Sequence, residues 1–141
     1  MVILNSTDVR KEWSSVVDSV VHDKPSLVKR TRDKIWLSNI AVMSDILDNF
    51  KFTATKFVEP DYSVTLSLNE IDIIENGKSE EEARQRLARS IMEYAEEFYN
   101  NYSYYSSAPN RKSHIPYIFK VLIYDDIDRL GDNIICQDGK N

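Results

Sequence analysis

The stretch STDVRKEWSSVVDSVV (residues 6–21), followed by PSLVKRTRDKIWLSNIAV (residues 25–42), decides the fold of the N-terminal part of the chain. Apolar residues recur in the first segment at spacings of three and four, which is the pattern of a helix with one buried stripe. The residues of this stripe are Val9, Trp13, Val16, Val17 and Val20. We therefore expect a helix over residues 7–21.

Both ends of this helix carry boundary signals. Ser6 or Thr7 is the expected N-cap, and Asp8 lies in the first turn, where the helix dipole favours a carboxylate. Pro25 disfavours a helical residue before it and so ends the helix. The apolar residues 2–4 predict a short strand ahead of the helix.

A hairpin is predicted after the helix. Residues 27–30 and 35–43 are rich in β-branched and aromatic side chains, and a polar turn separates them. This turn carries the cationic run Lys-Arg-Thr-Arg-Asp-Lys at residues 29–34. Residues 44–50 predict a short helix that packs back on the sheet. The N-terminal part therefore reads as a strand–helix–hairpin unit.

Charge is sorted along the chain. Residues 1–55 carry 8 Lys/Arg against 7 Asp/Glu, residues 56–141 carry 10 against 16, and the whole chain has a net charge of −5 with a pI near 5.0. An acidic protein does not bind nucleic acid with its whole surface. Any contact with DNA must be local, and the weakly cationic first part needs a second copy to double its positive charge.

The composition is that of an ordinary soluble globular protein, with 42% hydrophobic and 29% charged residues. The single cysteine, Cys136, excludes an intrachain disulfide framework and fits a reducing compartment. The N-terminus has no signal-peptide pattern, and no segment approaches the ~20 apolar residues that span a bilayer. We expect a cytoplasmic protein that does not contact a membrane.

The second part of the chain predicts a small α+β region. A polar stretch over residues 51–60 is the expected boundary between two domains, 1–52 and 58–141. Apolar and hydroxyl side chains alternate over residues 62–68, which predicts a strand with one buried face. The pair Asn76-Gly77 predicts a turn.

A long helix is the strongest element of this region. Ser79 and Glu82 form a capping box at its start. Its apolar face consists of Ala83, Leu87, Ile91, Tyr94, Ala95, Phe98 and Tyr102. Residues 103–113 predict a polar loop and residues 116–124 a strand, whereas residues 127–135 fit either a short helix or a strand. The expected fold is α+β, with this helix packed on a short antiparallel sheet.

The N-terminal pattern resembles the prevent-host-death (Phd/YefM) antitoxin family. The matching segments are STDVRKEW (6–13) and VVDSV (16–20) in the first helix, PSLVKR (25–30) and residues 35–42 in the hairpin, and DIL (45–47) in a closing helix. The hairpin tip has Arg32-Asp33 where the family has a glycine. The likeness covers roughly the first third to two fifths of the chain.

A second resemblance lies in the C-terminal part. Residues 61–70 (DYSVTLSLNE) and 75–83 (ENGKSEEEA) are similar to the strand–loop–helix of HicB-like antitoxin domains. Asn69 replaces the proline that precedes the glutamate in that pattern. Together the two resemblances imply an antitoxin with a Phd-like N-terminal domain and a folded C-terminal domain that binds the toxin.

The Phd/YefM resemblance implies a type II antitoxin that forms a homodimer, binds operator DNA, represses its own operon and neutralises a RelE-type toxin by direct contact. The expected DNA-binding residues are Ser6, Thr7, Arg10, Lys11, Arg30 and Arg32. Arg10 is the best candidate for a base edge, because a guanidinium bonds guanine in two places. The hydroxyls and the helix N-terminal amides suit phosphates. The plain alternative is a solvated hairpin tip.

Three tyrosines predict a surface for a protein partner. Tyr99, Tyr104 and Tyr105 lie off the apolar stripe of the long helix or beyond its end. Tyrosine is enriched at interface hot spots. We expect these residues to contact the toxin or a second subunit.

Two other classes of function stay open. The acidic total favours a protein- or ligand-binding module that kept the Phd-like scaffold without binding DNA. Asp61, Glu70, Asp72 and Glu75 raise the alternative of a metal-dependent nuclease, but their spacing follows no known ligand pattern. The sequence lacks a Gly-rich phosphate loop, a G-x-S-x-G motif and zinc spacing. We therefore expect no catalytic residue, no metal site, no cofactor and no enzyme activity.

Overall fold

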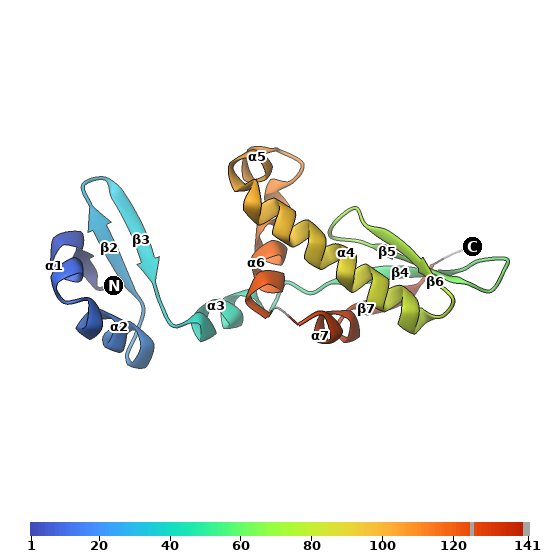
Figure 1. Ribbon diagram of the computed structural model, residues 1–141, viewed down its shortest axis with the longest axis horizontal. Coiled ribbons are helices and arrows are strands. Elements are labelled where there is room, and N and C mark those ends of the chain that lie inside the picture. The colour runs from blue at the N-terminus through green and yellow to red at the C-terminus, as the bar shows by residue number, and fades with distance from the viewer. Residues whose placement is uncertain (125, 140–141) are drawn as a thin grey trace. The chain divides into compact units, whose positions relative to one another are not determined.

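The chain folds into two compact units. The computed structural model describes residues 1–124 and 126–139 (Figure 1). Met1–Ile46 form the N-terminal unit and Leu47–Asn141 the C-terminal unit. Among the described residues, no helix combines the length and the apolar character needed to cross a membrane.

The N-terminal unit builds a three-stranded sheet with two short helices. Its elements are β1 (Ile3–Asn5), α1 (Ser6–Lys11), α2 (Trp13–His22), β2 (Ser26–Arg30) and β3 (Asp33–Leu37), and α3 (Ile40–Leu47) follows them. The strand order is β1-β2-β3, with β1 parallel and β3 antiparallel to β2. This order confirms the predicted strand–helix–hairpin arrangement.

The predicted single helix is two helices, because the backbone breaks at Glu12 (φ −119°, ψ 36°). The predicted N-cap was also wrong. Asn5, the last residue of β1, is extended and accepts the Thr7 N–H at 2.8 Å, so the strand passes directly into the capped helix. The break also turns Trp13 outward: its side chain is 55% exposed, and only Val9 and Val20 of the predicted stripe are buried.

The β2–β3 hairpin closes without glycine. Thr31 takes a positive φ of 54°, a conformation that costs a β-branched residue free energy. The returning strand is shorter than predicted, and the next helix begins at Ile40 rather than near residue 44. Asn39 explains the early start, because its side chain accepts the Ala41 N–H at 3.0 Å and caps α3.

The C-terminal unit packs helices on one mixed sheet. Its elements are β4 (Thr53–Val58), β5 (Val64–Leu68), β6 (Ile74–Gly77), α4 (Glu80–Asn100), α5 (Tyr102–Ser107), the 3₁₀ turn η1 (Lys112–His114), α6 (Ile115–Tyr124), α7 (Ile127–Asp132) and β7 (Ile135–Asp138). The strand order is β6-β5-β4-β7. Neighbouring strands are antiparallel except for β7, which runs parallel to β4.

Helix α4 organises the core of this unit. As predicted, Ser79 accepts the Glu82 N–H at 3.2 Å, and the Glu82 carboxylate reaches back to the Lys78 N–H at 2.8 Å. The face of α4 that packs on β5 and β6 is completely apolar. Its buried residues are Ala83, Leu87, Ala88, Ile91, Met92, Ala95 and Phe98.

Several other elements differ from the prediction. The expected boundary over residues 51–60 contains β4, an inner strand of the sheet, and the chain divides instead after Ile46. Lys56 hid this strand in the sequence, and its ammonium is satisfied by Glu80 at 3.7 Å. Residues 116–124 form helix α6 rather than a strand, since a short apolar run does not distinguish the two.

The rest of the C-terminal region resolves into short elements. The predicted polar loop over residues 103–113 contains α5 and begins η1. The segment over residues 127–135, for which both helix and strand were open, is helix α7 followed by the start of β7. The predicted turn at Asn76-Gly77 is instead the end of strand β6, which lies directly against the start of α4.

We predict that Gly77→Ala destabilises the C-terminal unit by about 2 kcal/mol, because overpacking a closed contact costs of this order. A Cβ at Gly77 would lie 2.5 Å from the Ala83 backbone nitrogen. Urea denaturation followed by far-UV circular dichroism measures the loss. The tryptophans at positions 13 and 36 report the N-terminal unit separately.

Gly131→Ala is the matched control. Its Cβ would meet ordinary van der Waals contacts of 3.4 Å or more inside helix α7, so stability should be unchanged or slightly higher. Equal midpoints for wild type and Gly77→Ala would contradict the close packing of β6 on α4.

Candidate functional site

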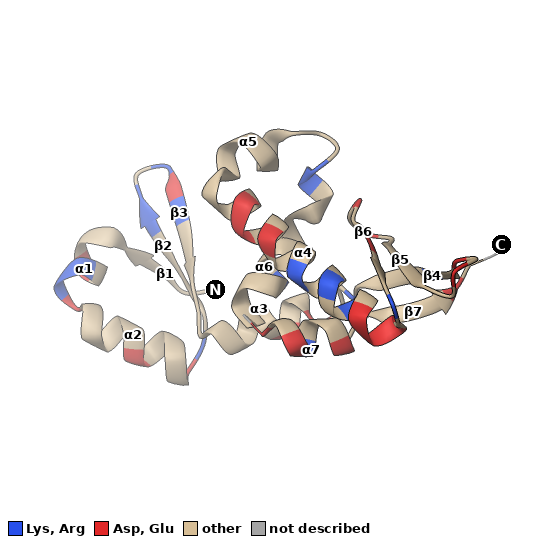
Figure 2. Cartoon of the chain, turned by 45° about the vertical axis from the view of Figure 1, so that its right-hand side comes forward, with Lys and Arg blue, Asp and Glu red and all other residues tan. Residues whose placement is uncertain are grey.

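The cationic residues of the N-terminal unit gather at one end of its sheet. Register places Lys29 opposite Lys34 beside the hairpin tip, and Asn5 at the start of α1 also lies opposite Lys29. Helix α1 has only six residues, so Arg10 lies about 8 Å along the axis from Asn5. Figure 2 shows the Lys and Arg positions on α1 and around the hairpin.

The six predicted DNA-binding residues differ in how available they are. Arg10, Lys11, Arg30, Arg32 and Thr7 are exposed, whereas Ser6 is half-buried. Arg30 pairs with Asp33 at 3.4 Å, but both side chains are more than 70% exposed, so the pair is weak. The Thr7 amide is already bound by Asn5, which leaves it no hydrogen for a phosphate.

One face of the N-terminal sheet carries an uncovered apolar row. Ile3, Leu27 and Trp36 stand opposite one another across the three strands. Ile3 is 57% and Trp36 is 42% exposed. Val28 points to the other face and is 5% exposed, and helix α1 contacts β1 and β2. The helices thus cover one face only.

The three predicted partner-binding tyrosines lie at and beyond the end of α4. Tyr99 and Tyr104 are 58% and 74% exposed. Tyr105 is half-buried, and its ring stacks on Phe98 with centroids 5.3 Å apart. The Tyr105 hydroxyl donates to Glu97 at 2.8 Å, and this hydrogen bond raises the pKa of Tyr105 above its ordinary value. Tyr105 therefore packs the structure as well as lining the surface.

Carboxylates surround these tyrosines. Glu93, Glu96 and Glu97 lie in the C-terminal half of α4 (Figure 2), and the last turn of the helix has no basic residue. A helix C-terminus disfavours negative charge. The surface around Tyr99 and Tyr104 is therefore acidic and aromatic at once.

A buried polar network near this surface has no signal in the sequence. The Arg111 guanidinium donates to the Tyr94 hydroxyl at 3.0 Å, and this hydroxyl lies 2.8 Å from His114 Nδ1. Burial, with the charge of Arg111 added, lowers the pKa of His114. These side chains line a hollow of about 510 Å³ together with Asp72 and Glu93. Positions 94 and 114 meet only because η1 folds back on α4.

The four carboxylates of the nuclease alternative do not form a metal centre in the described part of the chain. Three of them have local hydrogen-bond partners: Glu70 accepts from Thr53, Asp61 from Ser63, and Glu75 from Ser90. Within residues 1–124 and 126–139, no three His, Cys, Asp or Glu side chains come close enough to hold a metal ion.

Comparisons with known proteins place the chain in a family. A family model described as the PHD-like antitoxin of RelE/RelB toxin–antitoxin systems matches residues 1–135, which include the segment that resembles HicB-like domains. A crystal structure titled as an antitoxin part of a putative toxin/antitoxin system from Syntrophomonas wolfei subsp. wolfei superposes with a TM-score of 0.92. It shares 34% identity, over 99% of this chain and 100% of that chain.

A search of functionally curated proteins found no significant match. The family match confirms the predicted Phd-like antitoxin and its lack of enzyme activity, and the protein that such an antitoxin binds is a RelE-family toxin. The chain belongs to the PHD-like antitoxin family of RelE/RelB toxin–antitoxin systems.

Proposed function

We propose that this antitoxin works through two surfaces. The N-terminal unit forms a homodimer that binds operator DNA and represses its own operon, and the C-terminal unit holds the RelE-family toxin. The observation that carries the first part is the combination, in one small unit, of an uncovered apolar sheet face with a cationic sheet end.

The exposed apolar residues support a dimer of the N-terminal unit. Large apolar side chains more than a third exposed are numerous for a unit of this size, and contiguous patches of this kind mark interaction sites. They are Met1, Val2, Ile3, Trp13, Val21, Ile35, Trp36, Ile40 and Ile46. A second copy supplies an identical apolar face, and a two-fold axis lets the two faces cover each other.

We predict that Trp36→Glu weakens the homodimer at least tenfold, because it places a charge in the apolar row beside Ile3 and Leu27. Light scattering during gel filtration over a dilution series measures the dimer. Trp13→Glu is the matched control: its side chain is 55% exposed on α2, so the dimer should persist. A wild-type chain that is monomeric at every concentration would remove this proposal.

Charge supports DNA binding by the dimer rather than by one subunit. Residues 1–46 carry seven Lys/Arg and six Asp/Glu, so one unit is nearly neutral overall and its cations act locally. Two units joined by a two-fold axis present two cationic ends, which match two half-sites of a symmetric operator. Arg30 and Arg32 suit the phosphate backbone, and Arg10 suits a base edge.

We predict that Arg30→Ala weakens binding to the upstream DNA of its own gene for all sequences alike and lowers the salt slope by about 1 per site, as loss of one phosphate contact does. Arg10→Ala should also relax base preference at one operator position by about 1–3 kcal/mol. Fluorescence anisotropy across a salt series measures both effects.

Arg89→Ala is the control for these variants, because Arg89 is an exposed cation of the C-terminal unit. If the wild type shows no affinity at low salt, the second candidate function holds: a protein-binding scaffold without operator binding. The net charge of −5 favours that candidate.

Exposed aromatic rings among carboxylates support the toxin-binding role of the C-terminal unit. Tyr99 and Tyr104 offer rigid, amphipathic contact area, and the neighbouring glutamates attract a partner of opposite charge and speed its approach. Residues 47–141 carry eleven Lys/Arg and seventeen Asp/Glu. A basic toxin is the partner that such a surface fits.

We predict that Tyr104→Ala weakens toxin binding about tenfold or more, the loss typical of a hot-spot tyrosine. Isothermal titration with the purified toxin measures it, and growth rescue of toxin-expressing cells gives a second readout. Tyr62→Ala is the control, because Tyr62 is 84% exposed in the β4–β5 connection. Equal losses for both variants, or no loss for Tyr104→Ala, would place the toxin contact elsewhere.

A further inference from the structure

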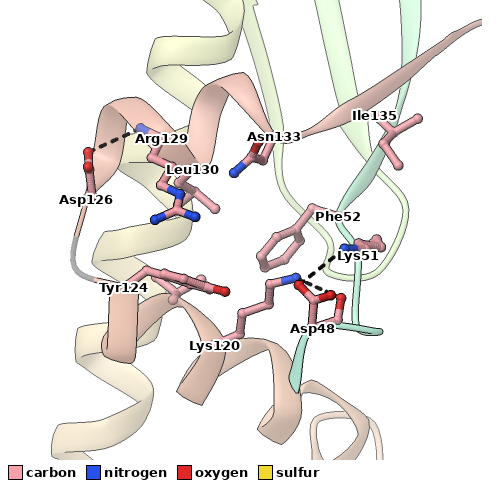
Figure 3. A pocket seen from close by; sticks show the side chains of 11 residues that line it. Asp48, Lys51, Phe52, Lys120, Tyr124, Asp126, Arg129, Leu130, Asn133 and Ile135 are labelled. Carbon is pink, nitrogen blue, oxygen red and sulfur yellow. Dashed lines mark hydrogen bonds and ion pairs between the residues drawn. The ribbon is translucent and has the colours of Figure 1, made fainter. Parts of the chain in front are cut away.

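A hollow of about 350 Å³ opens in the C-terminal unit between the connection from α3 to β4 and the helices α6 and α7 (Figure 3). Its apolar lining includes Phe52 and Val121, which are 4% and 2% exposed, and the half-buried Leu130. A hollow of this volume lies within the range that holds small molecules. None of its lining residues belongs to the two surfaces proposed above.

Lys120 brings a partly desolvated positive charge to this hollow. Its ammonium donates to the Phe50 carbonyl at 2.7 Å, and the Asp48 carbonyl lies at 3.5 Å. Burial lowers the pKa of Lys120, and the nearby charge of Lys51 lowers it further. In the described part of the chain Lys120 has no carboxylate within 4.0 Å, so its contacts there are with neutral oxygens.

Arg129 supplies a second positive charge. Its guanidinium lies 5.0 Å from the centre of the Tyr124 ring. In Figure 3 the guanidinium and the Lys120 ammonium lie on either side of the Phe52 ring. Two cations therefore border an apolar hollow.

The carboxylates that line the hollow are already engaged. Asp48 pairs with Lys51 at 3.4 Å, and Asp126 caps helix α7 by accepting the Arg129 backbone N–H at 3.2 Å. Neither carboxylate forms an ion pair with the side chain of Lys120 or Arg129. In a unit whose acidic residues outnumber its basic ones, this hollow concentrates positive charge.

We propose that the hollow is a binding site for a small anionic ligand, one that carries a carboxylate or phosphate on a flat apolar group. The anion would bind between Lys120 and Arg129, where charge-assisted hydrogen bonds form with both side chains. The apolar group would pack against Phe52, Val121 and Leu130. A phosphate or carboxylate there supplies the counter-charge that two neutral carbonyls do not.

Phenyl phosphate is a probe with this chemistry, and phenol and inorganic phosphate each carry one half of it. With the full-length antitoxin alone, we expect phenyl phosphate to bind and to raise the unfolding temperature more than either half. Isothermal titration and thermal unfolding measure the two effects. Equal or absent binding of all three probes would overturn the proposal.

Arg129→Gln separates this site from adsorption to surface cations. Arg129 is exposed, so its loss should leave the fold intact, and we expect phenyl phosphate to bind about tenfold more weakly. Lys120→Met should have a similar or larger effect. Arg89→Gln, on the outer surface of α4, should leave binding unchanged. Equal affinities for wild type and Arg129→Gln would exclude the hollow as the site.

The same variants distinguish a free ligand from a carboxylate of the toxin. We expect Arg129→Gln to retain wild-type toxin affinity, since the small molecule occupies the hollow in the antitoxin alone. If no probe binds and Arg129→Gln weakens the toxin complex, the hollow is a protein contact and the small-molecule proposal fails. Loss of toxin binding by Tyr104→Ala is independent of these results, so the two proposals fail separately.

Discussion

A unit of 46 residues with two short helices covers only one face of a three-stranded sheet, and this constraint governs the N-terminal unit. Domains of this size bury a small fraction of the surface of their unfolded chains. Val28 lies under the helices, whereas Ile3 and Trp36 on the opposite face stay in solvent. Pairing with a second copy removes that apolar surface from water and doubles the cations at the sheet end. One shortage of core thus connects stability, symmetry and the capacity to bind DNA.

The C-terminal unit meets the opposite condition. Helix α4 brings an apolar stripe of seven buried residues to the sheet, and α6 and α7 complete the enclosure. Its core needs no partner, so its outer surface is free to carry features that stability alone does not require. Carboxylates near the C-terminus of α4 oppose the helix dipole, and Tyr99 and Tyr104 expose aromatic area to water. Both features cost stability and favour contact with a basic partner.

Local signals predicted the fold where the deciding contacts are local. Ser79 with Glu82 fixed the start of α4, and the β2–β3 hairpin followed from two apolar runs around a polar turn. Failures occurred where distant contacts decide: α6 is a helix because the surrounding core receives Ile118 and Val121 on one face. The cationic residues were found by charge alone, since exposed charges need no partner. Tyr105 was only half understood, because its stacking on Phe98 depends on the path of α5.

Ion pairing shows why the hollow beside Lys120 differs from the rest of the C-terminal unit. Lys56 and Arg84 share Glu80, and Arg86 pairs with Glu82, so these cations fix the start of α4 against its neighbours. Arg84 also binds the carbonyls of Gly131 and Ile134 and thereby ties α7 and β7 to α4. Such cations are structural, because their partners are part of the fold. Lys120 and Arg129 instead border an open apolar space, where an anion with an apolar body would find charge and packing together.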